Sequence, residues 1–168
     1  MNIGNLISGL IAALIATILA IVYEIWAQKL RLRAEIVINT LSWIENIHIH
    51  LQEWQVHTGG IYTDGKPFLT QDEYNMACRE LKNKLLSREL QIRLALVYGK
   101  NSEEVKSFKA LKEKLFEAMI ILVDAKKETW DGTKKKIDEM FSQEIDPLWH
   151  RFEDKLLTKA SSRLFLTK

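Results

Sequence analysis

The chain carries one uninterrupted apolar run near its N-terminus, Leu6 to Tyr23, which contains no charged residue and no proline. As an α-helix, at about 1.5 Å per residue, this run is about 27 Å long. Apolar residues on both flanks, Ile3 and Ile25–Ala27, extend it past about 30 Å, the thickness of the hydrocarbon core of a bilayer. No other feature constrains the fold as strongly, because either lipid or a large protein core must cover such a segment.

Three structures accept an apolar run of this kind: a cleavable signal peptide, a helix buried in a soluble core, and a membrane anchor. A signal peptide has a basic N-terminal region and a shorter apolar segment of about 7–15 residues, whereas residues 1–5 hold no Lys or Arg. A helix that is apolar on all sides needs more surrounding protein than a chain of 168 residues provides. We therefore expect residues 1–27 to form an uncleaved transmembrane anchor.

The charges beside the run predict its orientation. Lys29, Arg31 and Arg33 follow it closely, and no basic residue precedes it. Positively charged flanks stay on the cytoplasmic side, which predicts a single-pass protein of the inner (plasma) membrane with an exported N-terminus and residues 28–168 in the cytoplasm. The same three residues would attract anionic lipid headgroups, at about 1 kcal/mol per charge, although topology signalling alone also explains them.

Small residues recur at every fourth position of the N-terminal segment, at Gly4, Ser8, Ala12, Ala16 and Ala20. On a helix these positions share one face, and small side chains let two helices pack closely in a membrane, where no hydrophobic force drives them together. Two interpretations stay open. The face either joins two copies of the chain through the membrane or reflects the ordinary Ala-rich composition of a span.

The remainder of the chain predicts an all-α domain. Only two prolines and seven glycines occur in the whole sequence, and a scarcity of breakers favours long helices. Residues 28–57 contain neither, and their apolar residues recur at spacings of three and four, which indicates a helix with one buried stripe. The stripe consists of Val37, Leu41, Ile44, Ile47, Leu51 and Trp54. We expect residues 28–57 to form a stalk helix that continues directly from the anchor.

A loop is expected after the stalk helix, over residues 58–69. It contains the pair Gly59-Gly60 and the turn-forming pair Asp64-Gly65, and Asp-Gly supplies the backbone angles of a tight turn. As the longest irregular segment it is a candidate for recognition. A plain connector is the alternative interpretation.

Capping and turn signals divide the rest of the cytosolic domain into helices. Thr70 and Glu73 have the spacing of a capping box. The apolar stripe shifts near Ser87, which indicates a bend, and Pro147 predicts either a kink or a junction of two helices. A turn is expected at Trp130–Gly132. The expected helices span about residues 71–98, 102–128 and 133–160. The fold class is therefore a transmembrane helix that continues into a cytosolic bundle of about four helices.

The histidines are the first candidates for chemistry. His50, Glu53 and His57 share one face of the stalk helix, but the two imidazoles are separated by about 10 Å along the axis, whereas a helical zinc pair needs His at positions i and i+4. We interpret this face as polar and solvated, and His48 as a packing histidine. The single cysteine, Cys78, lies on an apolar stripe, where a thiol is buried and unreactive. The sequence therefore predicts no catalytic residue, no metal site and no cofactor.

These features favour a non-enzymatic interaction or scaffold module whose cytosolic bundle binds a protein partner of unknown identity at the inner membrane. The alternative is an oligomerising membrane effector, in which the bundle senses a signal and the spans associate to perturb the bilayer. An enzyme with a site in the bundle core is a third hypothesis. The expected partners are membrane lipids, a protein and a second copy of the span. Nucleic acid is not expected, because the net charge is only +2 and no basic face is clustered.

Overall fold

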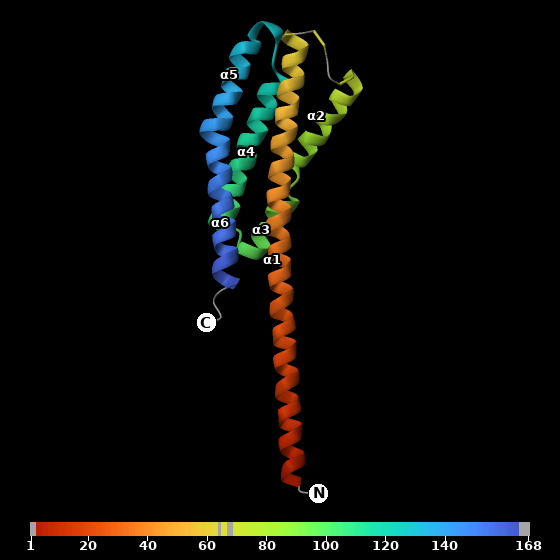
Figure 1. Ribbon diagram of the computed structural model, residues 1–168, viewed down its shortest axis with the longest axis vertical. Coiled ribbons are helices and arrows are strands. Elements are labelled where there is room, and N and C mark those ends of the chain that lie inside the picture. Colours follow the sequence, from red (N-terminus) through yellow and green to blue (C-terminus); the bar gives the residue numbers. More distant parts are fainter. Residues whose placement is uncertain (1–2, 64, 67–68, 165–168) are drawn as a thin grey trace. The chain divides into compact units, whose positions relative to one another are not determined.

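The computed structural model describes the backbone of residues 3–63, 65–66 and 69–164, and the side chains of residues 9–63, 65–66 and 69–159. Over these residues the chain is all α-helical and contains no β-strand. It divides into two compact units, Met1–Glu35 and Ile36–Lys168, and the first helix, α1 (Ile3–Thr63), runs through the boundary between them (Figure 1). The predicted all-α class, with one long apolar N-terminal helix and a bundle of about four helices, is confirmed.

The first unit consists of the N-terminal part of α1. Its large apolar side chains are exposed, among them Leu10, Leu14 and Leu19. The helix is long and apolar enough to cross a membrane, and none of its most apolar window is buried inside the structure. A core helix of a soluble protein would be mostly buried, so this exposure counts against the core-helix alternative.

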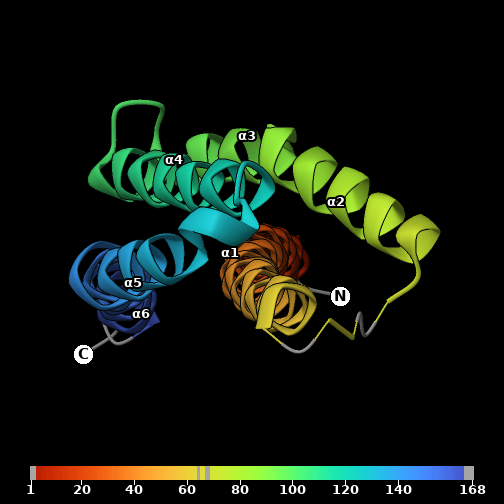
Figure 2. The ribbon, with the colours of Figure 1, turned by 90° about the horizontal axis from the view of Figure 1, so that it is seen from above.

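The second unit is a bundle around the C-terminal part of α1. Figure 2 looks along it and shows α1 flanked by α2 (Gln71–Leu86), α4 (Glu103–Val123), α5 (Trp130–Met140) and α6 (Asp146–Leu164). The apolar stripe predicted on α1 faces this bundle, because Ile44, Ile47 and Leu51 are fully buried. Aromatic pairs join α1 to its neighbours, for example Trp43 and Phe108, whose ring centroids lie 5.4 Å apart.

Helix α4 contributes the largest share of the core. It contacts α2, α5, α6 and the short helix α3 (Glu89–Tyr98). Phe108 of α4 lies 5.7 Å from the ring of Phe152 of α6, so α1, α4 and α6 meet at one aromatic cluster. The buried apolar residues of α4 are Val105, Phe108, Leu111, Leu115, Ala118, Met119 and Leu122. Their spacing is the near-heptad pattern of an amphipathic helix with a broad buried face.

The predicted end of the stalk helix is wrong. We expect a loop from residue 58, but α1 continues through both glycines to Thr63. Trp130 explains this difference, because its indole packs so closely on Gly59 that a Cβ there would lie 3.1 Å from Cζ2 of the ring. Tyr62 adds a T-shaped contact with the same indole and donates a 2.7 Å hydrogen bond to the carbonyl of Ala125. These tertiary contacts outweigh the intrinsic helix penalty of glycine, about 1 kcal/mol per residue.

The helix expected over residues 71–98 is two helices, α2 and α3, which are separated at Ser87 and Arg88. The bend predicted near Ser87 is therefore a complete break. The predicted capping box is confirmed at the start of α2: the Glu73 amide donates to Thr70 Oγ1 at 3.3 Å, and the Thr70 amide donates to Glu73 Oε2 at 2.8 Å. Two orphan donors of the first turn are satisfied in this way, which fixes where α2 begins.

Two boundaries in the C-terminal half differ from the expected ones. Helix α4 ends at Val123, and the 3₁₀ turn η1 (Lys127–Thr129) leads directly into α5, so the turn expected at residues 130–132 is the first turn of a helix. Trp130 is buried, and its packing on α1 anchors that turn. Helix α5 then passes through a π-helical turn, η2 (Phe141–Ile145), into α6. Pro147 lacks an amide donor and its ring crowds the preceding turn, and a wider turn relieves both problems.

Candidate interaction sites

The small-residue face lies on the N-terminal part of α1. Ala12, Ala16 and Ala20 are exposed there, whereas the side chains of Gly4 and Ser8 lie outside the described residues. A row of residues four apart is inclined to the helix axis, and two such rows interdigitate when right-handed helix pairs cross at about −40°. The exposed alanines therefore form a surface on which a second helix backbone can approach closely.

Polar groups beside this face are satisfied within the helix. Thr17 Oγ1 donates to the carbonyl of Ala13 at 2.9 Å, and Gln28 Nε2 donates to Glu24 Oε1 at 3.1 Å. Internal hydrogen bonds of this kind are what a lipid environment requires, because it offers no alternative partner. Tyr23 and Trp26 lie at the end of the apolar run, with ring centroids 6.2 Å apart, and aromatic residues of this kind are common at the ends of membrane spans.

The basic flank follows the apolar part of α1. Lys29 and Arg31 are exposed, and Arg33 is half-buried. All three lie in the unit Met1–Glu35, before α1 enters the bundle. Their side chains are long enough to place a charge at a headgroup layer while their stems cover apolar surface.

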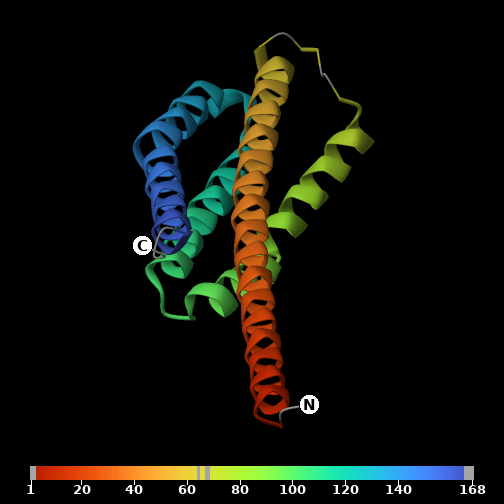
Figure 3. The ribbon, with the colours of Figure 1, turned by 60° about the horizontal axis from the view of Figure 1, so that its bottom comes forward.

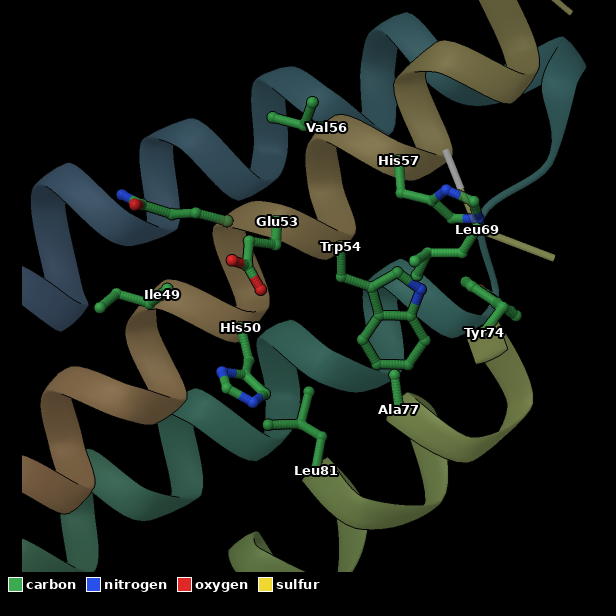
Figure 4. Close-up of a pocket in the computed structure, with 11 residues that line it drawn as sticks. Ile49, His50, Glu53, Trp54, Val56, His57, Leu69, Tyr74, Ala77 and Leu81 are labelled. Atoms are coloured by element: carbon green, nitrogen blue, oxygen red, sulfur yellow. The ribbon is translucent and has the colours of Figure 1, made fainter. Parts of the chain in front are cut away.

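A groove of about 540 Å³ lies between α1 and α2 (Figure 4). Trp54 extends from α1 toward Ala77 of α2, His50 points toward Leu81, and His57, Leu69 and Tyr74 gather at one end of the groove. We call this feature the α1–α2 groove. Its lining residues are Ile49, His50, Gln52, Glu53, Trp54, Val56, His57, Leu69, Tyr74, Ala77 and Leu81.

The periodicity of α1 explains how the groove is built. His50, Trp54 and His57 stand at positions i, i+4 and i+7, so one face of the helix turns all three toward α2. Ile49 and Val56 stand one position earlier, on the neighbouring face, where they remain exposed. The groove therefore has a deep aromatic wall and an apolar rim that is open to solvent.

His50 Nδ1 is a buried nitrogen in the groove with no hydrogen-bond partner within the described chain, and the indole N–H of Trp54 has only the Tyr74 hydroxyl beside it. Trp54 itself is only 7% exposed. An unpaired buried polar group costs about 1–3 kcal/mol, and the indole can only donate. A bound group that offers acceptor atoms beside an apolar surface would therefore be stabilised here.

The interpretation of the histidine face as solvated is wrong for His57, which is only 3% exposed. Tyr74 of α2 packs over it, with ring centroids 5.2 Å apart. Burial lowers the pKa of His57 below its ordinary value of 6.5 and raises the pKa of Tyr74. Both groups are therefore held in their neutral forms at pH 7. Glu53 is exposed and His50 half-buried, so the three residues do not share one environment.

His48 is a packing histidine, as predicted. Its ring lies 5.0 Å from that of Phe141 and 5.1 Å from that of Trp149. Burial lowers its pKa, and Asp146, whose Oδ1 lies 3.9 Å from Nε2, opposes that shift. The contacts join α1 to the π-helical turn and α6, away from the α1–α2 groove.

Helix α2 also carries Cys78, a half-buried free thiol that packs against the core. Burial raises the pKa of this thiol, which disfavours the reactive thiolate. Among the residues the structure describes, no group of three or more His, Cys, Asp or Glu side chains is placed to hold a metal ion. The arrangement in the α1–α2 groove is suited to binding an apolar group with acceptor atoms.

One feature of the sequence of α1 points to the groove. Ile49 falls outside the buried stripe, which indicates a second neighbour for α1. The identity of that neighbour depends on α2, whose contact with α1 joins segments more than ten residues apart in the chain. Comparison of the chain with protein-family models, with curated proteins and with solved structures gave no match.

Proposed function

We propose that this protein is a non-enzymatic interaction or scaffold module, which residues 1–27 anchor in the inner membrane and whose bundle binds a protein partner in the cytoplasm. The observation that supports this proposal is that the two parts of α1 have different surroundings. The N-terminal part of this helix has exposed apolar side chains, and its C-terminal part forms a wall of the bundle core. One helix therefore carries both the anchor and the binding domain.

The membrane assignment rests on the free energy of the exposed apolar surface. Leaving apolar area in water costs about 25 cal/mol per Å², and lipid removes that cost along the whole N-terminal part of α1. Lys29, Arg31 and Arg33 follow this segment and favour a cytoplasmic position for the bundle. Tethering raises the local concentration of a bound partner at the membrane without any further contact.

The α1–α2 groove is the partner site in this proposal. Its rim residues Ile49 and Val56 are exposed, and its wall holds the unpaired ring nitrogen of His50 and the indole of Trp54. Aromatic and apolar side chains of this kind dominate the binding energy of protein interfaces. We infer that the partner inserts an apolar side chain next to backbone or side-chain acceptors.

Site-specific photo-crosslinking in cells tests this proposal. A photoreactive phenylalanine at Val56, which is 62% exposed on the groove rim, is expected to give one discrete adduct in the membrane fraction. The same residue at Lys135, exposed on α5, is the matched control and is expected to give none. Addition of Ile49→Glu, which places a charge on the rim, is expected to reduce the Val56 adduct at least fivefold.

Equal adducts from Val56 and Lys135, or an Ile49→Glu variant that crosslinks as well as the parent, would contradict the groove as the partner site. Thermal unfolding of the Ile49→Glu variant provides the folding control. Ile49 is exposed, and surface substitutions usually change stability by less than about 0.5 kcal/mol.

A second candidate function, an oligomerising membrane effector, is favoured by the exposed alanines of α1. Ala12, Ala16 and Ala20 give that helix a face suited to close helix–helix packing. In this account the bundle senses a signal and the associated spans perturb the bilayer. The two accounts differ in whether partner binding depends on contact between spans.

A further inference from the structure

Helix α3 presents an apolar face that the described part of the bundle does not cover. Leu96 is 81% exposed and Ile92, one turn earlier, is 56% exposed. Leu94, on the other side of the helix, is fully buried and fixes α3 to the core. Leu94 thus anchors α3 to the core while two large apolar side chains on its other side stay exposed.

The charges around this face are mainly basic. Arg88 and Lys100 are exposed at the two ends of α3. The one acidic residue of the helix, Glu89, is neutralised by Arg93, whose Nη2 lies 2.7 Å from Glu89 Oε1. An apolar face flanked by positive charge is complementary to an anionic lipid surface, which attracts basic residues near it.

Within the unit Ile36–Lys168, α3 lies at the end of the bundle at which α1 enters. Figures 1 and 3 both show it there beside the first bundle residues of α1, at the end opposite to the connection between α1 and α2. The covalent link to the anchor therefore leaves from the end of the bundle that carries α3.

The length of that link limits how far this end can lie from a membrane. Residues 28–35 are helical and extend about 12 Å at 1.5 Å per residue. The headgroup layer on each side of the hydrocarbon core takes about 5–7 Å of this distance. Transmembrane helices tilt by about 20° on average, and a tilted helix shortens this distance further.

We propose that α3 docks on the cytoplasmic surface of an anionic bilayer, with Ile92 and Leu96 inserted at the boundary between headgroups and acyl chains and with Arg88 and Lys100 bound to lipid phosphates. This inference rests on the proposed anchoring of residues 1–27. A helix of this length binds membranes weakly by itself, but the anchor makes its docking an intramolecular event. Docking fixes the orientation of the α1–α2 groove relative to the membrane.

Spin-label accessibility in the full-length protein tests this docking. Single cysteines at Leu14, Leu96 and the exposed Met76 of α2 are introduced in a Cys78→Ala background. Each labelled protein is reconstituted at one copy per nanodisc that contains about one third anionic lipid. We expect the label at Leu96 to resemble the label at Leu14, with high collision rates for oxygen and low rates for a water-soluble nickel complex. The label at Met76 is expected to show the reverse.

The three positions separate failure of this inference from failure of the proposed anchor. If Leu14 reports lipid while Leu96 matches Met76, the docking of α3 is overturned and the anchor stands. If Leu14 itself reports water, both are overturned. Low rates for both reagents at Leu96 would show a protein contact in place of lipid and would also overturn the docking.

A label at Ile92 gives an independent measurement, and its collision rates are expected to agree with those of the label at Leu96.

The double variant Arg88→Gln, Lys100→Gln tests the role of charge. Its label at Leu96 is expected to shift toward the Met76 value, and nanodiscs of neutral lipid are expected to produce the same shift in the parent protein. A Leu96 signal that does not respond to either change would overturn the assignment of an anionic surface.

Discussion

His57 shows how one residue connects the groove to the stability of the bundle. Its side chain is buried under Tyr74, and burial lowers its pKa. The neutral imidazole is therefore part of the folded structure. Protonation in the folded state would place a charge on a side chain that is only 3% exposed, which is costly unless a partner compensates it.

Acidification from pH 7 to pH 5 is expected to lower the free energy of unfolding. The unfolded chain binds a proton at His57 near the ordinary pKa of 6.5, whereas the folded chain binds it only at lower pH because burial lowers the pKa. The stability that the neutral imidazole contributes is therefore fully present above pH 6.5 and is lost as the pH falls below it. His48, whose pKa is also lowered by burial against the opposing effect of Asp146, acts in the same direction. Denaturant unfolding of the full chain in detergent, followed by tryptophan fluorescence at several pH values, measures this dependence.

The variant His57→Gln is expected to flatten the pH dependence between pH 7 and pH 5. The control His150→Gln makes the same substitution at an exposed histidine of α6. Equal slopes for the parent protein and the His57→Gln variant would contradict the assignment of a buried neutral His57.

Single residues also mark the limit of what the sequence predicts. Glu103 and Glu104 lie in the first turn of α4, where the helix dipole favours negative charge. Glu104, however, is 1% exposed and forms an ion pair with Lys159 of α6. Like the burial of His57 by α2, this pairing joins segments far apart in the chain, so local pattern could not predict it.

At the scale of elements, local patterns predicted the helices well and their ends less well. The buried stripe of α1 and the capping box of α2 follow from spacing and side-chain chemistry, and both are confirmed. The end of α1 at Thr63 depends instead on Trp130, which packs on Gly59 from a helix that begins far along the chain. The α1–α2 groove is unpredictable for the same reason, since both of its walls are needed to define it.

The exposed alanines of α1 allow a test at this scale. The tethered-module account predicts that Ala12→Ile with Ala16→Ile leaves the Val56 crosslink to the partner unchanged, because the groove lies in the other unit. The control Leu14→Ile with Ile18→Leu changes the same helix but leaves both alanines in place. Partner crosslinking and the oligomeric mass of the full-length protein in detergent are measured for all three proteins.

A loss of the partner crosslink together with a lower oligomeric mass, in the alanine variant alone, would contradict the module account. That result would favour the effector, because bulky side chains at Ala12 and Ala16 block close approach of two helix backbones. A lower mass with an unchanged crosslink would show that the spans associate but that partner binding does not depend on it.

At the scale of the whole molecule, each of the two units has one role in the proposed function. The unit Met1–Glu35 supplies the apolar segment and the basic flank, and the unit Ile36–Lys168 supplies the core, the groove and α3. The apolar run and the helical periodicity predicted the apolar segment, the basic flank and the helical core, but not the groove or the separate helix α3. The proposed function requires that a membrane separates the N-terminus from the bundle.

Thiol labelling of spheroplasts with a membrane-impermeant maleimide tests this claim most directly. Single cysteines replace Asn5, before the apolar run, and Lys135, an exposed residue of the bundle, in the Cys78→Ala background. We predict that the cysteine at position 5 is labelled in intact spheroplasts, and that the cysteine at position 135 is labelled only after lysis. Labelling of position 135 in intact spheroplasts, or recovery of the protein in the soluble fraction, would contradict the account.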